Sequence, residues 1–156
     1  MALFLWLNNH MTSKNKFLYI DGHPDPTKEI VLNKVVNVAR QHFKLPDKII
    51  FEMRKLGFST YGETIVDPRY KNRIKLNIDL GINETVYVLT HEIIHLSQIT
   101  TGQLAMGKNG SYVWDFGYQV PRQKVCNLTY AEYLQLPWEA DVVKKQQFLL
   151  EKLLKK

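Results

Sequence analysis

Hydrophobic and polar positions follow different periods along the chain, and each period predicts an element. A short apolar run at 17–20, ended by Asp-Gly, predicts a strand. Segment 25–43, opened by Asp-Pro, has apolar residues at helical spacing and predicts a helix. Positions 48–54 and 73–79 alternate between apolar and polar residues, which predicts two more strands, with a turn at 56–62 between them. The order of these elements indicates an α+β fold.

A second helical pattern runs from Asn83, which suits an N-cap, to Gly102, which is a stop signal. Its apolar positions recur at three- and four-residue steps and form one stripe: Val86, Leu89, Ile93, Leu96 and Thr100. His91 and His95 fall on a flank of this stripe, together with Gln98. We therefore expect an amphipathic helix with two histidines beside its core face.

His91 and His95 are four residues apart, and Glu92 directly follows the first histidine. Positions i and i+4 of a helix share a face, so both imidazoles can reach one metal ion. Glu92 projects beside them, where its carboxylate can take a proton from water activated by the metal. This H-E-x-x-H spacing is typical of zinc metallopeptidases, and chance produces it in under about one in a hundred chains of this size. Two solvated surface histidines are the alternative, but they do not account for the adjacent glutamate.

A catalytic zinc ion usually has three protein ligands and one open position, so a third ligand is needed. No histidine follows His95, and the downstream candidates are Asp115, Cys126, Glu132, Glu139, Asp141 and Glu151. Glu139 is favoured because Pro137-Trp138-Glu139-Ala140 suits the first turn of a helix, expected to reach about 154, that packs against another helix. Glu132 and Asp141 remain open as alternatives.

A long connection at 102–129 separates these two helices. Loops longer than about 15 residues are uncommon in compact domains and are often functional. Its glycine, aromatic and arginine residues allow two interpretations: Gly107, Gly110, Tyr112, Trp114, Gly117, Tyr118 and Arg122. The connection either forms a cleft wall that offers a tyrosine or arginine to an oxyanion, or is an Ω-loop packed on its own aromatics.

Composition and charge add limits to this picture. With 156 residues and 45% hydrophobic content, the chain suits one domain at 17–156, after an N-terminal extension at 1–16 in which Met11 is an alternative start. The apolar residues 1–7 are too few to span a membrane, so no membrane partner is expected. A net charge of +6 would suit nucleic acid, but no nucleic-acid-binding motif supports that partner. The single cysteine, Cys126, excludes an intramolecular disulfide, fits a reducing compartment and is expected to be buried.

Segment 73–143 resembles the gluzincin class of zinc metallopeptidases, in particular small single-domain zincins of bacteria and phages. The resemblance lies in Val88-Leu89-Thr90-His91-Glu92-Ile93-Ile94-His95-Leu96-Ser97-Gln98 and in Tyr133-Leu134-Gln135-Leu136-Pro137-Trp138-Glu139-Ala140. It implies a minimal zincin-like fold: an N-terminal helix packed on a small mixed sheet, the H-E-x-x-H helix, a long loop, and a C-terminal helix that carries the third ligand. SprT-like proteases are a more distant resemblance, because their third-histidine pattern is missing here.

The same resemblance leaves one position unassigned. Larger gluzincins often carry an aspartate four residues after the ligand glutamate, and that position is Val143 here. The residue that orients a metal-binding histidine is therefore not identified by the resemblance, and Asp141 is a candidate for this role.

Together, these patterns predict a zinc-dependent metalloendopeptidase that hydrolyses a specific protein or peptide substrate in the cytoplasm. His91, His95 and Glu139 bind Zn²⁺, and Glu92 is the general base. An extended substrate can add to the sheet edge beside the metal helix. The alternative is a catalytically silent or occluded zincin-fold module with a binding or structural role, such as a phage or toxin-system component. The intact Glu92 argues against this alternative.

Overall fold

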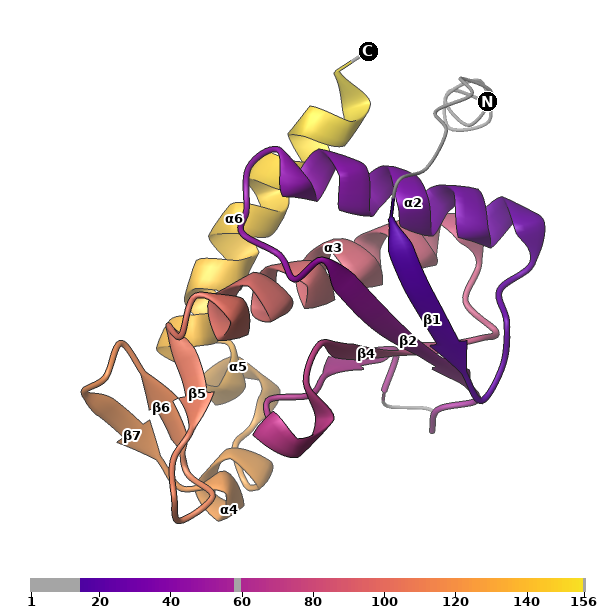
Figure 1. The fold of residues 1–156 in the computed structure, drawn as a ribbon. Helices are drawn as coiled ribbons and strands as arrows, with labels where there is room; N and C mark the ends of the chain where they lie inside the picture. The colour runs from indigo at the N-terminus through magenta and orange to yellow at the C-terminus, as the bar shows by residue number, and fades with distance from the viewer. Residues whose placement is uncertain (1–14, 58–59, 156) are drawn as a thin grey trace.

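The computed structural model describes residues 15–57 and 60–155 and has an α+β architecture (Figure 1). Its elements follow one another as β1 (Lys16–Ile20), α2 (Pro26–Arg40), β2 (Lys48–Arg54), β3 (Gly62–Thr64), η1 (Pro68–Tyr70), β4 (Arg73–Asn77), α3 (Ile82–Thr100), β5 (Leu104–Met106), β6 (Tyr112–Trp114), β7 (Tyr118–Val120), α4 (Arg122–Cys126), α5 (Tyr130–Tyr133) and α6 (Pro137–Leu154). Every predicted strand and helix outside the long connection forms, with ends within a few residues of those expected.

The main sheet has the strand order β1-β2-β4-β3. β1, β2 and β4 run parallel, and α2 connects β1 to β2 as a crossover helix. β3 pairs antiparallel with β4 at the edge, so the sheet is mixed, as expected. The sequence pattern missed β3, because a strand of three residues is too short for a clear alternation.

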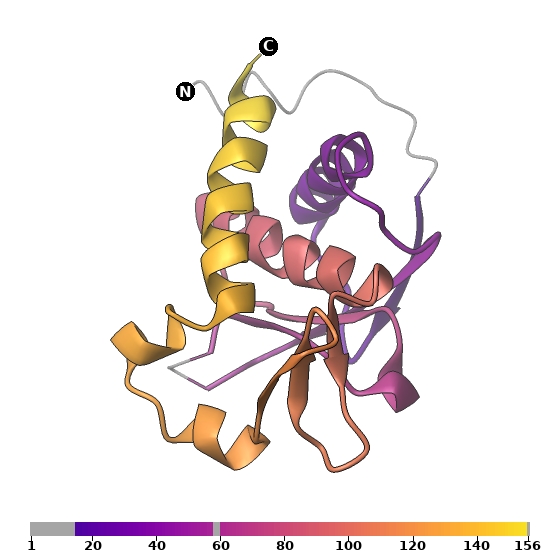
Figure 2. The same ribbon diagram turned by 90° about the vertical axis from the view of Figure 1, so that its left-hand side faces the viewer.

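α2 and α3 pack together over the main sheet, and α6 crosses α3 (Figures 1 and 2). The core between them contains fully buried side chains from both helices and from β2 and β4: Val31, Leu32, Val35, Val36, Ala39, Ile49, Phe51, Ile74, Leu76, Leu89, Ile93 and Ile94. Apolar residues at helical spacing in α2 and α3, and at alternate positions in β2 and β4, therefore meet in one layer.

α3 begins at Ile82, so the prediction of an N-cap at Asn83 is wrong. Gly81 precedes the helix, and its N–H donates a hydrogen bond of 2.8 Å to Glu84 Oε2, which satisfies one backbone donor of the first turn. Gly102 follows the helix with a φ of 77°, a left-handed conformation that favours glycine, and this confirms the predicted stop.

Burial around α3 extends beyond the predicted stripe. Thr100 at its end is half-buried, whereas Glu92 and His95, outside the stripe, are both buried. The helix is enclosed because α2, β3, β4 and α6 all contact it. Its polar flank therefore faces the interior of the molecule, which is an unusual place for ionisable side chains without a partner.

The connection at 102–129 is not an irregular loop, so the Ω-loop interpretation is wrong. It contains the antiparallel sheet β5-β6-β7 and the short helix α4. This small sheet has its own apolar cluster of buried residues: Leu104, Val120, Leu136 and Trp138. Each strand has only three residues, and so short a segment has no period that distinguishes it from a loop.

Two further expectations concern the ends of the domain and its cysteine. Residues 1–14 of the predicted N-terminal extension, including Met11, lie outside the described residues, whereas Asn15 is described and Lys16 already belongs to β1. Cys126 is exposed at the end of α4, a helix with no buried residue, so the prediction of a buried cysteine is wrong. In the part of the chain that the structure describes, no helix combines the length and apolar content that a membrane crossing needs.

Candidate metal centre

Two helices bring three of the predicted residues to one point. His91 Nε2 and His95 Nε2, on α3, are 3.2 Å apart. Glu139, in the first turn of α6, places Oε2 3.3 Å from His91 Nε2 and Oε1 3.1 Å from His95 Nε2. Ligand atoms that surround a tetrahedral zinc ion at its usual bond lengths lie about 3.3 Å from one another. Each imidazole nitrogen thus lies at about this distance from the other and from one oxygen of the Glu139 carboxylate, and one ligand atom from each of the three residues lies within 4.8 Å of the other two, which is close enough for one ion.

Glu139 is a buried carboxylate with one oxygen that a cation could bind. It is only 1% exposed, and its Oε2 has no hydrogen-bond partner, whereas Oε1 accepts a hydrogen bond of 2.6 Å from Tyr133 Oη. Burial opposes ionisation, but interactions with His91, His95 and Tyr133 outweigh it and lower the pKa of Glu139 to about 2. An ionised, buried carboxylate with one unsatisfied oxygen, facing two imidazoles, fits a zinc ion.

The competing third-ligand candidates lie elsewhere. Glu132 is exposed and caps α5, where its Oε2 accepts hydrogen bonds from the Thr129 N–H and hydroxyl. Asp141 Oδ2 accepts hydrogen bonds from Gln98 and Lys145. The remaining candidates, Asp115, Cys126 and Glu151, are all exposed. Among the described residues, the group of histidine and acidic side chains suited to one ion is His91, His95 and Glu139.

Gln98 holds His95 in a fixed orientation, a role that the sequence did not assign. His95 Nδ1 lies 2.9 Å from Gln98 Oε1, so Nδ1–H is the donor and Nε2 is left to face His91 and Glu139. The Gln98 amide then donates to Trp138 O at 3.0 Å and to Asp141 Oδ2 at 2.8 Å. Asp141, the predicted candidate, thus supports Gln98 and does not itself contact the histidine.

His95 and its neighbours are also electrostatically coupled. Burial disfavours the charged imidazolium, but the Glu139 carboxylate outweighs burial, so the pKa of His95 is raised. A bound cation would replace this proton, because it needs the neutral imidazole. His91 is less enclosed, with 24% of its side chain exposed, so the centre opens to solvent on that side.

Glu92 is held beside the triangle by the edge strand of the main sheet. Thr64 Oγ1, on β3, lies 2.7 Å from Glu92 Oε2 and 2.8 Å from the Glu92 carbonyl oxygen. β3 can approach α3 so closely only because residue 62 is glycine. A Cβ at Gly62 would lie 2.5 Å from Val88 Cγ1 and 3.1 Å from Glu92 Cγ. The position of the predicted general base therefore depends on the contact between β3 and α3.

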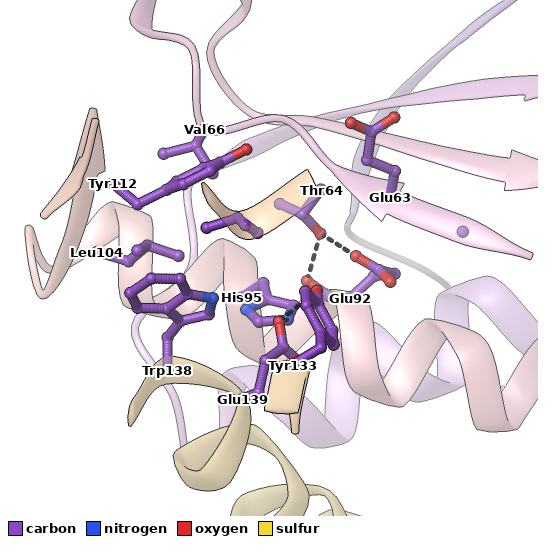
Figure 3. A pocket seen from close by; sticks show the side chains of 12 residues that line it. Glu63, Thr64, Val66, Glu92, His95, Leu104, Tyr112, Tyr133, Trp138 and Glu139 are labelled. Carbon is purple, nitrogen blue, oxygen red and sulfur yellow. Dashed lines mark hydrogen bonds and ion pairs between the residues drawn. The ribbon is translucent and has the colours of Figure 1, made fainter. Parts of the chain in front are cut away.

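Thr64, Glu92, His95 and Glu139 line a pocket of about 160 Å³ (Figure 3). Glu92 and Thr64 lie on one side of it, and Tyr133 and Glu139 face His95. The predicted cleft wall is present in part: of the seven residues named in the connection, all within the described chain, Tyr112 alone lines this pocket. Leu104 and Val125, from the same connection, complete that wall and were not foreseen.

Tyr133 is a site residue that sequence reasoning missed. Burial and the nearby Glu139 carboxylate raise the pKa of its phenol, so the hydroxyl keeps its proton and acts as a hydrogen-bond donor. Its helix, α5, begins with a capping box formed by Thr129 and Glu132. That local pattern is visible in the sequence and could have predicted a helical turn from Thr129 that ends at Tyr133.

Comparison with protein-family models, with curated proteins and with solved structures gave no match for this chain. Support for a function therefore comes from the geometry and chemistry of the site.

Proposed function

We propose that this protein is a zinc-dependent metallopeptidase with a minimal zincin-like fold. The observation that carries the proposal is the cluster of His91 Nε2, His95 Nε2 and the Glu139 carboxylate, in which the two nitrogens are 3.2 Å apart and each lies 3.1–3.3 Å from one carboxylate oxygen, beside the buried Glu92. Two imidazoles and one carboxylate are a donor set that catalytic zinc sites use, with one coordination position left open. A structural zinc site would instead be closed by four protein ligands.

Glu92 is the general base of the proposed reaction. His91, His95 and Glu139 would hold the zinc ion, which would supply Lewis-acid chemistry by polarising the scissile carbonyl and making a water molecule more acidic. Glu92 takes a proton from the attacking water and passes it to the nitrogen of the leaving amine as the peptide bond breaks. Thr64 orients the carboxylate, because its hydroxyl is within hydrogen-bonding distance of Glu92 Oε2.

Tyr133 is the residue of this chain best suited to stabilise the oxyanion. Its hydroxyl is protonated, lines the pocket and now donates to Glu139 Oε1. A substrate carbonyl oxygen that develops negative charge near Glu139 would be within reach of the same donor, after a rotation of the phenol O–H. Tyr112, on the opposite wall, presents a second phenol to the pocket.

The free edge of β3 supports the binding of an extended peptide. Asn77 N–H donates to Tyr61 O, and Ile65 N–H donates to Arg73 O, so these alternate residues of the β3 segment face β4. The intervening Gly62 and Thr64 therefore direct their backbone N–H and C=O groups away from β4. Among the described strands none pairs with that edge, which is open to strand addition beside Glu92.

The test is Glu92→Gln, which keeps the shape of the side chain but removes the base. We expect zinc content and unfolding temperature equal to the parent, with hydrolysis lowered by about 10²- to 10⁴-fold. Cleavage is followed by mass spectrometry on a peptide library and on unfolded proteins, with and without a chelator. Glu84→Gln, the same change at the exposed start of α3, is the control and should keep full activity.

The outcomes separate peptidase from binding module. Activity that persists in Glu92→Gln contradicts the proposed mechanism. Bound zinc without cleavage of any tested substrate by the parent favours a silent module, which chelation would still destabilise. Because the pocket is small, we expect the parent to cleave few sequences. Zinc-loaded Glu92→Gln, incubated with lysate, should then retain the substrate protein.

A further inference from the structure

A second cavity, of about 380 Å³, adjoins the metal-centre pocket. It lies between the segment that follows β3, the last turn of α3 and strand β5. Seven of its eleven lining residues are apolar, among them Ile65, Val66, Ile99, Leu104, Ala105 and Met106, and the polar ones are Asp67, Lys71, Asn72 and Thr100. Val66 and Leu104 line both cavities, so the second one is the continuation of the metal-centre pocket along the chain direction of β3.

The cavity stands at a fixed distance from the proposed site of bond cleavage. Thr64, which contacts Glu92, and Val66, which borders the cavity, are two residues apart on the same extended segment. Two residues of an extended chain span about 6.6 Å. In a peptide that adds to the free edge of β3, the residue beside Val66 is therefore about two positions away from the residue beside Glu92.

We propose that this cavity is a specificity subsite, which binds a large aliphatic side chain, Leu, Ile or Met, on the N-terminal side of the cleaved bond. The direction follows from pairing: antiparallel strands are the more stable arrangement, so a substrate paired with β3 reaches the Val66 end with its N-terminal part. The aliphatic class of this side chain follows from the apolar majority of the lining, against which an apolar side chain gains free energy on burial. The Asp67 carboxylate at the border of the cavity is already paired with Arg69, so a charged side chain would lose hydration there without gaining that partner.

The proposal rests on the peptidase function, but the first measurement of its test does not require turnover. Random peptides displayed on phage are selected on zinc-loaded Glu92→Gln protein. We expect one position enriched in Leu, Ile or Met, and replacement of that residue by alanine in a synthetic peptide should weaken binding by about tenfold or more. Selection without any enriched aliphatic position overturns the proposal.

Variants within the cavity provide the second measurement, each combined with Glu92→Gln. Ala105→Trp, which fills the cavity, should abolish the enrichment. Gln119→Trp, which places the same side chain at an exposed position of β7, should retain it. Met106→Ala widens the cavity and should shift the preference toward Phe or Trp, and this variant keeps the test decisive if Ala105→Trp does not fold. Unchanged selection in a folded Ala105→Trp or in Met106→Ala overturns the proposal.

The selected peptides are finally given to the parent protein. Cleavage on the C-terminal side of the enriched residue supports both the subsite and its direction. Cleavage on the N-terminal side overturns the antiparallel placement. Peptides that bind through the aliphatic residue but are never cut contradict the peptidase function and leave the subsite standing, so the two failures are distinguishable.

Discussion

The two walls of the metal-centre pocket are built from different kinds of element. One wall consists of α3 and α6, with 19 and 18 residues, and it presents Glu92, His95 and Glu139 to the pocket, while the third proposed ligand, His91, lies on α3 beside His95. The other wall consists of β3, β5, β6 and α4, which have three to five residues each and contribute both polar side chains, such as Glu63 and Thr64, and apolar ones, such as Leu104 and Val125. The proposed zinc ligands and the general base thus lie on long helices, whereas short elements hold the residues that assist them, Thr64 on β3 and Tyr133 on α5, and most of the expected contacts with substrate. Substitutions in the first wall should therefore have the larger effects.

The largest effect is expected for Glu139→Ala. The parent should retain about one zinc ion per chain after dialysis, and the variant almost none, because two histidines seldom hold zinc at neutral pH. Elemental analysis measures the content. Asp141→Ala should lose less zinc and Glu132→Ala least, because neither carboxylate contacts the histidines. Equal zinc content in Glu139→Ala and the parent would move the third ligand to another residue.

Gln98→Ala should have the next largest effect, because it removes support from the helical wall and leaves every zinc ligand in place. Loss of a hydrogen-bond partner of a metal-binding histidine typically costs about 10- to 100-fold in metal affinity. The change also leaves Trp138 O and Asp141 without the Gln98 amide, which costs about 1–3 kcal/mol of unfolding free energy per unsatisfied group. Competition with a chromophoric chelator and urea unfolding measure the two losses.

Gln98→Glu separates these two roles. A carboxylate still accepts from His95 Nδ1 but cannot donate to Trp138 O, and it repels Asp141. We expect near-parental zinc affinity with reduced stability. If both Gln98 variants bind zinc as tightly as the parent, the histidine does not depend on this residue.

The difference between the walls also explains what the sequence could predict. The spacing of His91, Glu92 and His95 is a local property of one helix, so their shared face followed from the sequence alone. The prediction of Glu139 required only that the first turn of its helix pack against another helix. The sequence around Pro137 indicated both the start of a helix and a packed first turn. Gln98 stands one turn beyond His95, yet its orientation depends on groups across the helix interface, which local spacing does not encode.

The short-element wall was the part that could not be predicted. Strands of three residues have no measurable period, and their stability comes from pairing with distant segments. The close approach of β3 to α3 depends on Gly62, and a single glycine in a sequence signals equally a turn, a bulge or such a contact. The position of Tyr133 likewise depends on how α5 is placed against α6.

Gly62→Ala should have an intermediate effect, because it acts where the two walls touch. The new methyl group would overlap Val88 Cγ1 and crowd Glu92 Cγ. Overpacking of this kind costs about 1–3 kcal/mol of unfolding free energy, and a general base displaced by about 1 Å can cost about 100-fold in rate. Zinc content should not change. Gly57→Ala is the matched control, because no atom lies within 4 Å of a Cβ built there.

A second substitution sharpens that prediction. Val88→Ala, introduced together with Gly62→Ala, removes the closest overlapping atom and should restore part of the lost activity, although each change alone lowers stability. The double variant is compared with both single variants in the same cleavage and unfolding assays. Activity in the double variant no higher than in Gly62→Ala would mean that β3 does not position Glu92 through this contact.

The smallest effect is expected at the tip of the β6–β7 hairpin, residues 115–117, none of which lines the metal-centre pocket. Phe116 is 86% exposed and has a φ of 61°. Phe116→Gly relieves a left-handed conformation that costs about 1–2 kcal/mol, but glycine adds about 0.5–1 kcal/mol of backbone freedom to the unfolded chain. These terms nearly cancel, so urea unfolding should shift by less than about 1 kcal/mol, with zinc content and peptide selection unchanged. A loss of zinc in this variant would show that the small sheet affects zinc binding, which contradicts the assignment of the metal centre to α3 and α6 alone.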